Sequence, residues 1–427
     1  MDMEKAKLIK AVDTHFEYED GSYFCPIGTT IYALAYQDDA LINETFESLD
    51  NSPYNKVRMC VFPKWFDYNR DEPECFPFEI TDGKIDISKP VDAFWKKLEA
   101  IIARMADLDI QCDLILLHPY DKWGFSKLAA KDVVTYLEYA VSRFGSFDNI
   151  WWSMANEYDI MPYTNEEWNE FIKTVRKADG ARHLLSIHNM IVPWDFSGEC
   201  LTHSCLQIKS VERVSQTISE YKKPLMVDEC CYEGNIPFEW GNISGRELVN
   251  RFWKVYCQGG YASHGETFLS EDNILWWSKG GKLKGESTAR IAFLKAVLEE
   301  IGGPLKYTEH EVTWEEMQYI MANPPEFMKD SPMVNLAGKV NKDQAMQMLL
   351  DAKLYSSAYE DKAYLKYFGN HCQAVGDINL PEDKEYCVFI IDTWNMTKEL
   401  IQENASGHFE VALPGKEGIA ILALRRE

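Results

Sequence analysis

Short apolar runs alternate with longer amphipathic stretches along the first 300 or so residues. The runs have the length of strands and are bounded by turn residues and charged positions. Eight of them are candidates for buried strands, at residues 28–36, 56–62, 112–118, 149–155, 183–188, 200–208, 224–228 and 260–267.

The segments between these runs repeat their apolar residues at helical spacing. In residues 91–108, for example, Phe94, Leu98 and Met105 share one face of the expected helix. Strands that alternate with helices over this length predict an α/β fold, a (β/α)8 TIM barrel. An open doubly wound sheet is the alternative, but it favours a glycine-rich phosphate loop after its first strand, which residues 25–30 lack. Further helices are expected at residues 131–144, 165–178, 211–221 and 245–258.

The pattern changes after about residue 300. Gly302-Gly303-Pro304 ends the last helix of the barrel, and Pro324-Pro325 marks a further loop. The alternating runs that follow are short and separated by turn residues, which is typical of a small antiparallel β-sandwich. These runs lie at residues 363–368, 385–391, 408–413 and 418–424. We therefore expect a catalytic barrel over residues 1–302 and, over residues 303–427, a linker with a C-terminal β-sandwich.

The charge balance narrows the class of ligand. The chain has 44 Lys and Arg against 68 Asp and Glu, a net charge of −24. Such a chain repels polyphosphates and anionic surfaces, so we expect no nucleic-acid partner and no membrane partner. Neutral molecules are not repelled, and an aromatic content of 13% suits aromatic-lined clefts. A carbohydrate substrate is compatible with both observations.

The location of the protein is inferred from what the chain does not contain. The first residues include no apolar core of a secretion signal, and no run of about 18 apolar residues occurs. The eleven cysteines form no CxxC pair and lie mostly in apolar runs, which favours reduced, buried thiols. We expect a soluble, cytoplasmic protein, and the sequence leaves the oligomeric state open.

Polar side chains gather where the expected strands end. The active site of a (β/α)8 barrel lies at the C-terminal ends of its strands. Nearly every candidate strand ends in polar or ionisable residues although its interior is apolar, which indicates one catalytic face. The residues at these ends include Trp65, His118, Tyr120, Trp123, Asn156, Glu157, His188, His203, Glu229, His264 and Glu266.

Two carboxylates stand out among these residues. Glu157 ends the expected fourth strand and Glu229 ends the seventh, so the two face each other across a barrel mouth. Such a pair can flank a glycosidic bond, one carboxyl protonating the leaving oxygen and the other attacking the anomeric carbon. The acid needs a raised pKa, which the neighbouring Trp151 and Trp152 can provide by desolvation.

These residues resemble the retaining glycoside hydrolases of the (β/α)8 clan that contains cellulases, β-mannanases and β-galactosidases. The segments 151–159 (Trp-Trp-Ser-Met-Ala-Asn-Glu-Tyr-Asp), 118–121 (His-Pro-Tyr-Asp) and 26–30 (Pro-Ile-Gly-Thr-Thr) look more specifically like the apiosidase-like glycosidase family. Members of that family often have a C-terminal β-domain. The resemblance covers about residues 20–300 well and the rest more loosely.

The resemblance implies a role for individual residues. Glu157 corresponds to the general acid/base and Glu229 to the nucleophile, while Asn156 binds the sugar 2-hydroxyl and Arg58 keeps the nucleophile ionised. One departure concerns the eighth strand, where residues 265–268 (Gly-Glu-Thr-Phe) replace the usual Trp. Trp276 or Trp277 then supplies the sugar platform.

Other interpretations of these residues stay open. Histidines 118, 188, 203 and 264 can bind sugar, orient neighbours or hold a metal, but metal-dependent hydrolase barrels usually begin with His-x-His on strand one, which is absent here. Trp65 and Trp123 follow strands and suit stacking on pyranoses, or they anchor loops. Arg58 can equally form a structural salt bridge. We expect no metal and no cofactor.

The sequence therefore predicts a retaining glycoside hydrolase, an endoglucanase or β-glycosidase. Its expected substrate is a neutral oligo- or polysaccharide, because the acidic balance disfavours polyuronates. The alternatives are a carbohydrate-binding pseudo-enzyme that kept the cleft and, less favoured, a metal-dependent barrel hydrolase. The sugar, the linkage and endo or exo action stay undetermined.

Overall fold

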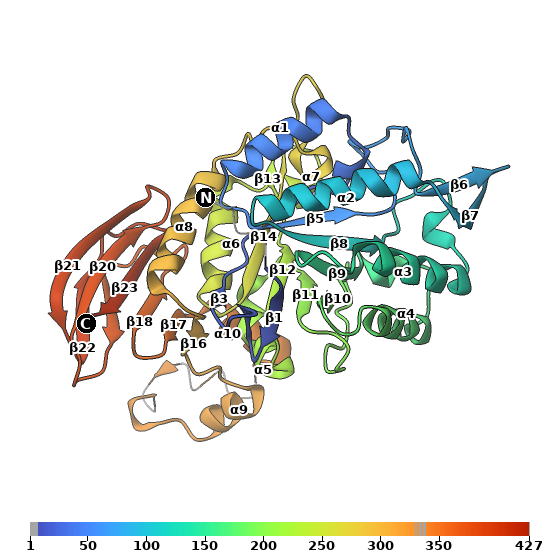
Figure 1. Cartoon of the computed structure of the whole chain (residues 1–427). Coiled ribbons are helices and arrows are strands. Elements are labelled where there is room, and N and C mark those ends of the chain that lie inside the picture. The colour runs from blue at the N-terminus through green and yellow to red at the C-terminus, as the bar shows by residue number, and fades with distance from the viewer. Residues whose placement is uncertain (1–6, 329–330, 333–334, 336–338, 427) are drawn as a thin grey trace.

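A computed structural model describes residues 7–328, 331–332, 335 and 339–426 of the chain (Figure 1). Residues 1–6 and 427, the outer ends of the two expected domains, lie outside the described residues. Residues 1–6 are also most of the N-terminal segment in which we expected no secretion signal. No helix of the described part is long and apolar enough to cross a membrane.

The centre of the molecule is a parallel sheet of eight strands, which confirms the predicted α/β barrel. The sheet order is β10-β9-β8-β5-β4-β14-β12-β11, so every strand lies beside its neighbour in the barrel sequence. A single parallel bridge between His188 and Cys205 joins the two end strands and nearly closes the barrel. The strands are β4 (Gly28–Thr30), β5 (Lys56–Cys60), β8 (Gln111–Leu117), β9 (Ile150–Ala155), β10 (Leu184–Ser186), β11 (Ser204–Gln207), β12 (Leu225–Glu229) and β14 (Tyr261–His264).

All eight expected strands form, most of them shorter than the apolar runs that predicted them. The first is the clearest case, since β4 ends at Thr30 and the chain continues into a 3-10 helix at Leu34–Tyr36. Residues 31–35 are buried although they do not form the expected strand. An apolar run shows burial and does not by itself distinguish a strand from a turn packed in the core.

Helices surround the barrel and bury one face each. In α2 the buried face contains Phe94, Leu98 and Met105, as the spacing predicted, and in α4 a capping box between Thr164 and Glu167 begins the helix. The helices are α1 (Asp39–Asp50), α2 (Asp92–Asp107), α3 (Ala130–Phe144), α4 (Asn165–Ala178), α5 (Val214–Tyr221), α6 (Gly245–Tyr256), α7 (Trp276–Lys279) and α8 (Ser287–Ile301).

Three small elements were not predicted. A three-stranded meander of β1 (Ile9–Val12), β2 (His15–Tyr18) and β3 (Tyr23–Phe24) covers the N-terminal end of the barrel, where the Phe16 ring lies 5.0 Å from Trp151 and 5.3 Å from Tyr261. The hairpin of β6 (Phe78–Thr81) and β7 (Lys84–Pro90) projects from the barrel (Figure 1). The short strand β13 (Glu233–Gly234) pairs with β15 (Glu266–Thr267), which is the end of the run 260–267 expected as one strand.

The C-terminal part contains the expected antiparallel sheets, beside α8 and α6 (Figure 1). Six strands have the order β16-β17-β18-β23-β20-β21, and β19 pairs with β22. Helices α9 (Trp314–Ala322) and α10 (Lys342–Asp351) lie in the segment expected as a linker. The strands are β16 (Lys306–Tyr307), β17 (Tyr355–Tyr359), β18 (Ala363–Tyr367), β19 (Val375–Asn379), β20 (Tyr386–Asp392), β21 (Thr397–Ala405), β22 (His408–Ala412) and β23 (Ile419–Arg425). The domain boundary between residues 302 and 303 stays a prediction.

The interior of the barrel contains a buried ionic layer. Lys56 on β5 is fully buried, and its Nζ lies 2.5 Å from Asp113 Oδ2 on β8 and 2.8 Å from Asp228 Oδ1 on β12. Ser263 donates a further hydrogen bond to Asp228 at 2.6 Å. Burial raises the pKa of Asp228, but the Lys56 and Arg58 cations outweigh it and hold that pKa well below its usual range. The layer ties three strands of the barrel together by charge.

Replacing Lys56 with Met should leave Asp113 and Asp228 buried without their shared cation. We expect the free energy of unfolding to fall by about 3–5 kcal/mol, the typical cost of removing one partner of a buried ion pair. Urea unfolding of the variant and the wild-type chain at neutral pH measures this difference in the free energy of unfolding. Lys96→Met is the control, because Lys96 pairs with Asp92 on the exposed face of α2 and its loss should cost at most about 1 kcal/mol. Equal effects of the two substitutions would contradict a structural role for the buried layer.

Candidate active site

The C-terminal ends of the barrel strands enclose a cavity of about 200 Å³. Three of the residues expected at the site, Tyr120, Glu157 and Glu229, line it. Its remaining walls are mostly aromatic and apolar and come from the loops after several strands. They include Tyr32, Phe66, Met190, Tyr232, Phe238, Trp240 and Trp277.

Glu157 follows β9 with an unusual backbone. Its φ of 57° lies in the left-handed region, which costs energy for a residue with a side chain and often marks a functional site. The carboxyl is 5% exposed and accepts a hydrogen bond from the Tyr120 hydroxyl. Burial and the nearby Glu229 carboxylate raise the pKa of Glu157 to about 7. The side chain therefore holds a proton near neutrality.

Glu229 ends β12 and is surrounded by hydrogen-bond donors. The Tyr32 hydroxyl and the Arg58 guanidinium, at 3.3 Å, donate to Oε1, and the Trp240 indole donates to Oε2 at 3.2 Å. Burial raises the pKa of Glu229, but His188, Arg58 and Tyr32 outweigh it and lower that pKa to about 2. Glu229 is thus ionised over the whole neutral range.

Gln207 at the end of β11 lies between the two carboxyls. With its NH2 group directed at the surrounding acceptors, the amide nitrogen is 3.2 Å from Glu157 Oε1 and 3.2 Å from Glu229 Oε2. These two carboxylate oxygens can therefore be no farther apart than twice that distance.

Arg58 and Asn156 stand behind Glu229 in one buried network. Nη1 of Arg58 donates to Asn156 Oδ1 at 2.8 Å and to the Tyr32 hydroxyl at 3.2 Å, and Tyr32 lies 3.0 Å from the same Asn156 oxygen. Arg58 is fully buried, and its Nε lies 3.8 Å from Asp113 in the ionic layer below. The network connects the barrel interior to the cavity.

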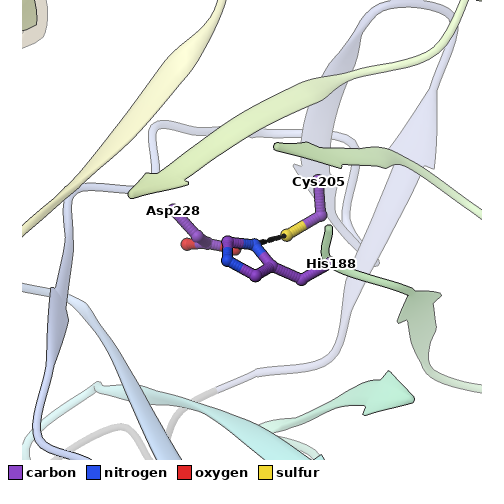
Figure 2. Close-up of side chains that lie close together, drawn as sticks. All are labelled: His188, Cys205 and Asp228. Carbon is purple, nitrogen blue, oxygen red and sulfur yellow. Dashed lines mark hydrogen bonds between the residues drawn. The ribbon is translucent and has the colours of Figure 1, made fainter. Parts of the chain in front are cut away.

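His188, Cys205 and Asp228 form a buried cluster (Figure 2). His188 Nε2 lies 3.4 Å from Glu229 Oε1. The ligand atoms of the three cluster residues lie within 4.8 Å of one another, close enough to hold a metal ion. They already bond to one another, since His188 Nδ1 is 3.2 Å from Cys205 Sγ and that thiol donates to Asp228 at 3.0 Å. Lys56 and Arg58 also lower the pKa of Asp228 at this place, so an added cation would meet two positive charges. The absence of a metal stays a prediction.

Three other expected residues lie near the strand ends but outside the cavity wall. His118 is buried with Nε2 3.0 Å from the Phe62 carbonyl. His264 stacks on Tyr54 with its Nδ1 3.1 Å from Thr29. Glu266 accepts hydrogen bonds from the backbone amides of residues 284 and 285, at 2.6 and 2.8 Å. Burial raises the pKa of Glu266 to about 7. These three groups hold neighbouring loops and strands.

The tryptophans divide into two places. Trp277 lines the cavity, whereas Trp276 is buried behind it and donates to Thr29 Oγ1 at 2.8 Å. Trp65 and Trp123 contact each other outside the cavity, with ring centroids 5.8 Å apart. Of the two tryptophans considered as a sugar platform after strand eight, the structure therefore directs Trp277 toward the cavity.

Two residues of the site, Tyr32 and Gln207, escaped the sequence analysis, because they lay inside or at the end of apolar runs and looked like core positions. Lys64 and Trp240 follow expected strands in the sequence, and both line the cavity. Residues at or just after the C-terminal end of a barrel strand face the active site. Tyr32 follows strand one, Lys64 follows strand two and Gln207 ends strand six. This rule identifies them only when the strand ends are known to within a residue.

Comparison with known proteins supports the barrel assignment. Residues 11–329 match the model of the apiosidase-like catalytic domain, and residues 352–423 match a domain of unknown function, DUF5605. None of the curated proteins matches the sequence significantly.

Solved structures similar to this chain are described as glycoside hydrolases. A candidate glycoside hydrolase from Bacteroides vulgatus is 29% identical with a TM-score of 0.83, covering 100% of this chain and 84% of its own. A family 5 glycoside hydrolase from Bacteroides vulgatus has 14% identity and a TM-score of 0.70, with coverage of 97% and 93%. A family 5 mannosidase from Rhizomucor miehei has 11% identity and a TM-score of 0.51, covering 69% and 98%. The last two share the fold alone. With its catalytic-domain match spanning the whole barrel, the chain belongs to the apiosidase-like family.

Proposed function

We propose that this protein hydrolyses O-glycosidic bonds in a largely neutral oligo- or polysaccharide with retention of anomeric configuration. Membership of the apiosidase-like family and the similarity to proteins described as glycoside hydrolases support an enzyme that acts on glycosides. The cavity of about 200 Å³ is lined mainly by aromatic and apolar side chains, which suit the apolar faces of a sugar ring. An endoglucanase or a β-glycosidase that binds one sugar deeply agrees with this geometry.

The observation that carries the proposal is the opposite pKa shift of two carboxyls in one cavity. Glu229, with its pKa lowered to about 2, is the nucleophile. Glu157, with its pKa raised to about 7, is the general acid. A catalytic pair of this kind needs one ionised and one protonated member at the same pH.

The reaction then takes two steps. Glu229 attacks the anomeric carbon while Glu157 gives its proton to the leaving oxygen, so the glycosidic bond breaks and a glycosyl ester forms on Glu229. In the second step Glu157, now ionised, takes a proton from water as the water oxygen attacks the anomeric carbon. The ester breaks, which releases the sugar and restores both carboxyls without any cofactor.

The spacing of the two carboxyls supports retention. Their oxygens at the Gln207 amide are separated by at most twice 3.2 Å. Retaining enzymes place the two carboxyls about 5–5.5 Å apart, and inverting enzymes about 6.5–9.5 Å apart to admit a water molecule. The upper bound applies to one oxygen of each carboxyl and lies just below the inverting range, so the Gln207 bridge favours the shorter separation and the anomer of the product tests it.

Neighbouring residues have supporting roles in this proposal. Arg58, Tyr32 and His188 keep Glu229 ionised, and Tyr120 orients the proton-bearing carboxyl of Glu157. The oxygen of Asn156 is occupied by Arg58 and Tyr32, which leaves its NH2 group for the sugar 2-hydroxyl.

Two further groups act around this centre. We assign Trp65 and Trp123 to sugar units beyond the cavity, because both lie outside its wall. His118, His264, Glu266 and Trp276 shape the cavity from behind through the loops and strands that they hold.

Substituting the two carboxyls tests the roles on a panel of aryl α- and β-glycosides and oligosaccharides. Glu229→Gln should abolish turnover, and Glu157→Gln should lower kcat/KM by about 10²–10⁴-fold on substrates with poor leaving groups, the usual share of general acid catalysis. Glu239→Gln is the control, because Glu239 is exposed on a loop of the same barrel face. Its kcat/KM should equal that of the wild-type chain. NMR of the first-formed product should show the anomer of the substrate. A product of inverted configuration would contradict retention. Full activity of Glu229→Gln would rule out Glu229 as the nucleophile.

The pH profile follows from the two pKa values. The active form has Glu229 ionised and Glu157 protonated, so kcat/KM should fall as the pH rises through about 7, where Glu157 loses its proton. On the acid side activity should persist down to the stability limit of the fold, because Glu229 takes up a proton only near pH 2. In Glu157→Gln the alkaline limb should disappear on activated aryl glycosides, and its persistence would show that another group titrates there.

A further inference from the structure

Lys64 occupies an unusual place in the cavity. It follows β5 in the chain, its side chain is 5% exposed, and it lines the same cavity as Glu157 and Glu229. The catalytic steps described above leave it without a role.

The Lys64 ammonium faces aromatic rings. Its Nζ lies 3.4 Å from the centroid of the Tyr32 ring, 4.7 Å from Tyr120 and 5.2 Å from Trp277. Ring faces attract a cation, but they do not satisfy the three N–H donors of an ammonium. Within the described part of the chain, no side-chain hydrogen bond or ion pair reaches this Nζ.

The other buried Lys and Arg side chains among the described residues are paired, which makes Lys64 exceptional among them. Lys56 lies against Asp113 and Asp228, and Arg58 lies against Glu229 and Asn156. Lys353, on the C-terminal side, bonds Glu311 and Ser215 at 2.6 Å each. A buried charge without a partner is costly, and burial accordingly lowers the pKa of Lys64. An anionic acceptor on a ligand in the cavity would restore the charged form and complete its hydrogen bonds.

The two cavity carboxylates do not take that place. Glu229 is already bonded to Tyr32, Arg58 and Trp240, and its charge is balanced by the guanidinium. Glu157 is bonded to Tyr120 and carries a proton in the active form. The charges of both carboxylates oppose the lowering of the Lys64 pKa by burial, but no described hydrogen bond or ion pair joins them to Lys64, and protonation of Glu157 removes its share.

We propose that Lys64 binds a carboxylate on the sugar held in the cavity, so that the bound unit is a single acidic sugar in an otherwise neutral glycan. This inference rests on the proposed function and names its substrate class. It does not conflict with the net charge of −24, because charges are screened over about 8 Å at physiological ionic strength. Repulsion acts on a polyanion along the whole surface, whereas one carboxylate inside the cavity meets the ammonium directly.

Calorimetric titration at pH 6 with free sugars tests this without requiring turnover. D-glucuronate and D-galacturonate should each bind at least about tenfold more tightly than D-glucose and D-galactose, and Lys64→Met should remove that difference, about 1.4 kcal/mol for each factor of ten. Lys64→Gln, which keeps donors but loses the charge, should also lose the preference. Thermal unfolding of both variants checks that they fold.

The control is Lys209→Met. Lys209 lies near the Trp240 ring on the same barrel face but is half exposed and paired with Glu239, so the acid preference should persist. No preference for the acids in the wild-type chain, or a preference that survives in Lys64→Met, overturns the proposal. Glu229→Gln separates the two hypotheses, because it should keep acid binding. Binding without turnover of any glycoside by the wild-type chain would contradict the hydrolase and leave the Lys64 site standing.

Discussion

The pairing of buried charges inside the barrel is the constraint on which the rest of this structure depends. Lys56, Arg58, Asp113 and Asp228 lie fully or almost fully out of water, and each side chain lies within 4 Å of an opposite charge. Isolated charges there would cost more than the fold can supply. Because the partners come from β5, β8 and β12, their pairing joins these three strands across the interior of the barrel.

The catalytic geometry grows out of that layer. Arg58 reaches from the layer to Glu229, and Tyr32 and Asn156 complete the contact. Glu157 has no cation of this kind bonded to it and lies among aromatic and apolar walls, so burial dominates its proton affinity. Two identical carboxyls thus differ in protonation because one is joined to the ionic layer and the other faces the cavity. Lys64 adds a buried amine whose Nζ faces aromatic rings and has no hydrogen bond or ion pair within the described residues.

Much of this arrangement could be predicted from the sequence. The alternation of apolar runs and amphipathic stretches is a local property, and it placed all eight barrel strands and five helices, α2 to α6, close to where they form. Glu157 and Glu229 could be singled out because each ends such a run. The N-terminal meander and the hairpin of β6 and β7 were missed because their strands are partly exposed and form no continuous apolar run.

What the sequence by itself determined is the order of elements, the barrel, the C-terminal β-domain and the two candidate carboxyls, since these follow from local spacing and from strand ends. Only the tertiary structure decided which groups meet across the barrel mouth. It placed Trp277 rather than Trp276 at the cavity, put Gln207 between the carboxyls and directed the Lys64 amine at aromatic rings. The reason is that these contacts join residues far apart in the chain, and pKa values and cavity walls depend on distances of a few ångströms that no local pattern encodes.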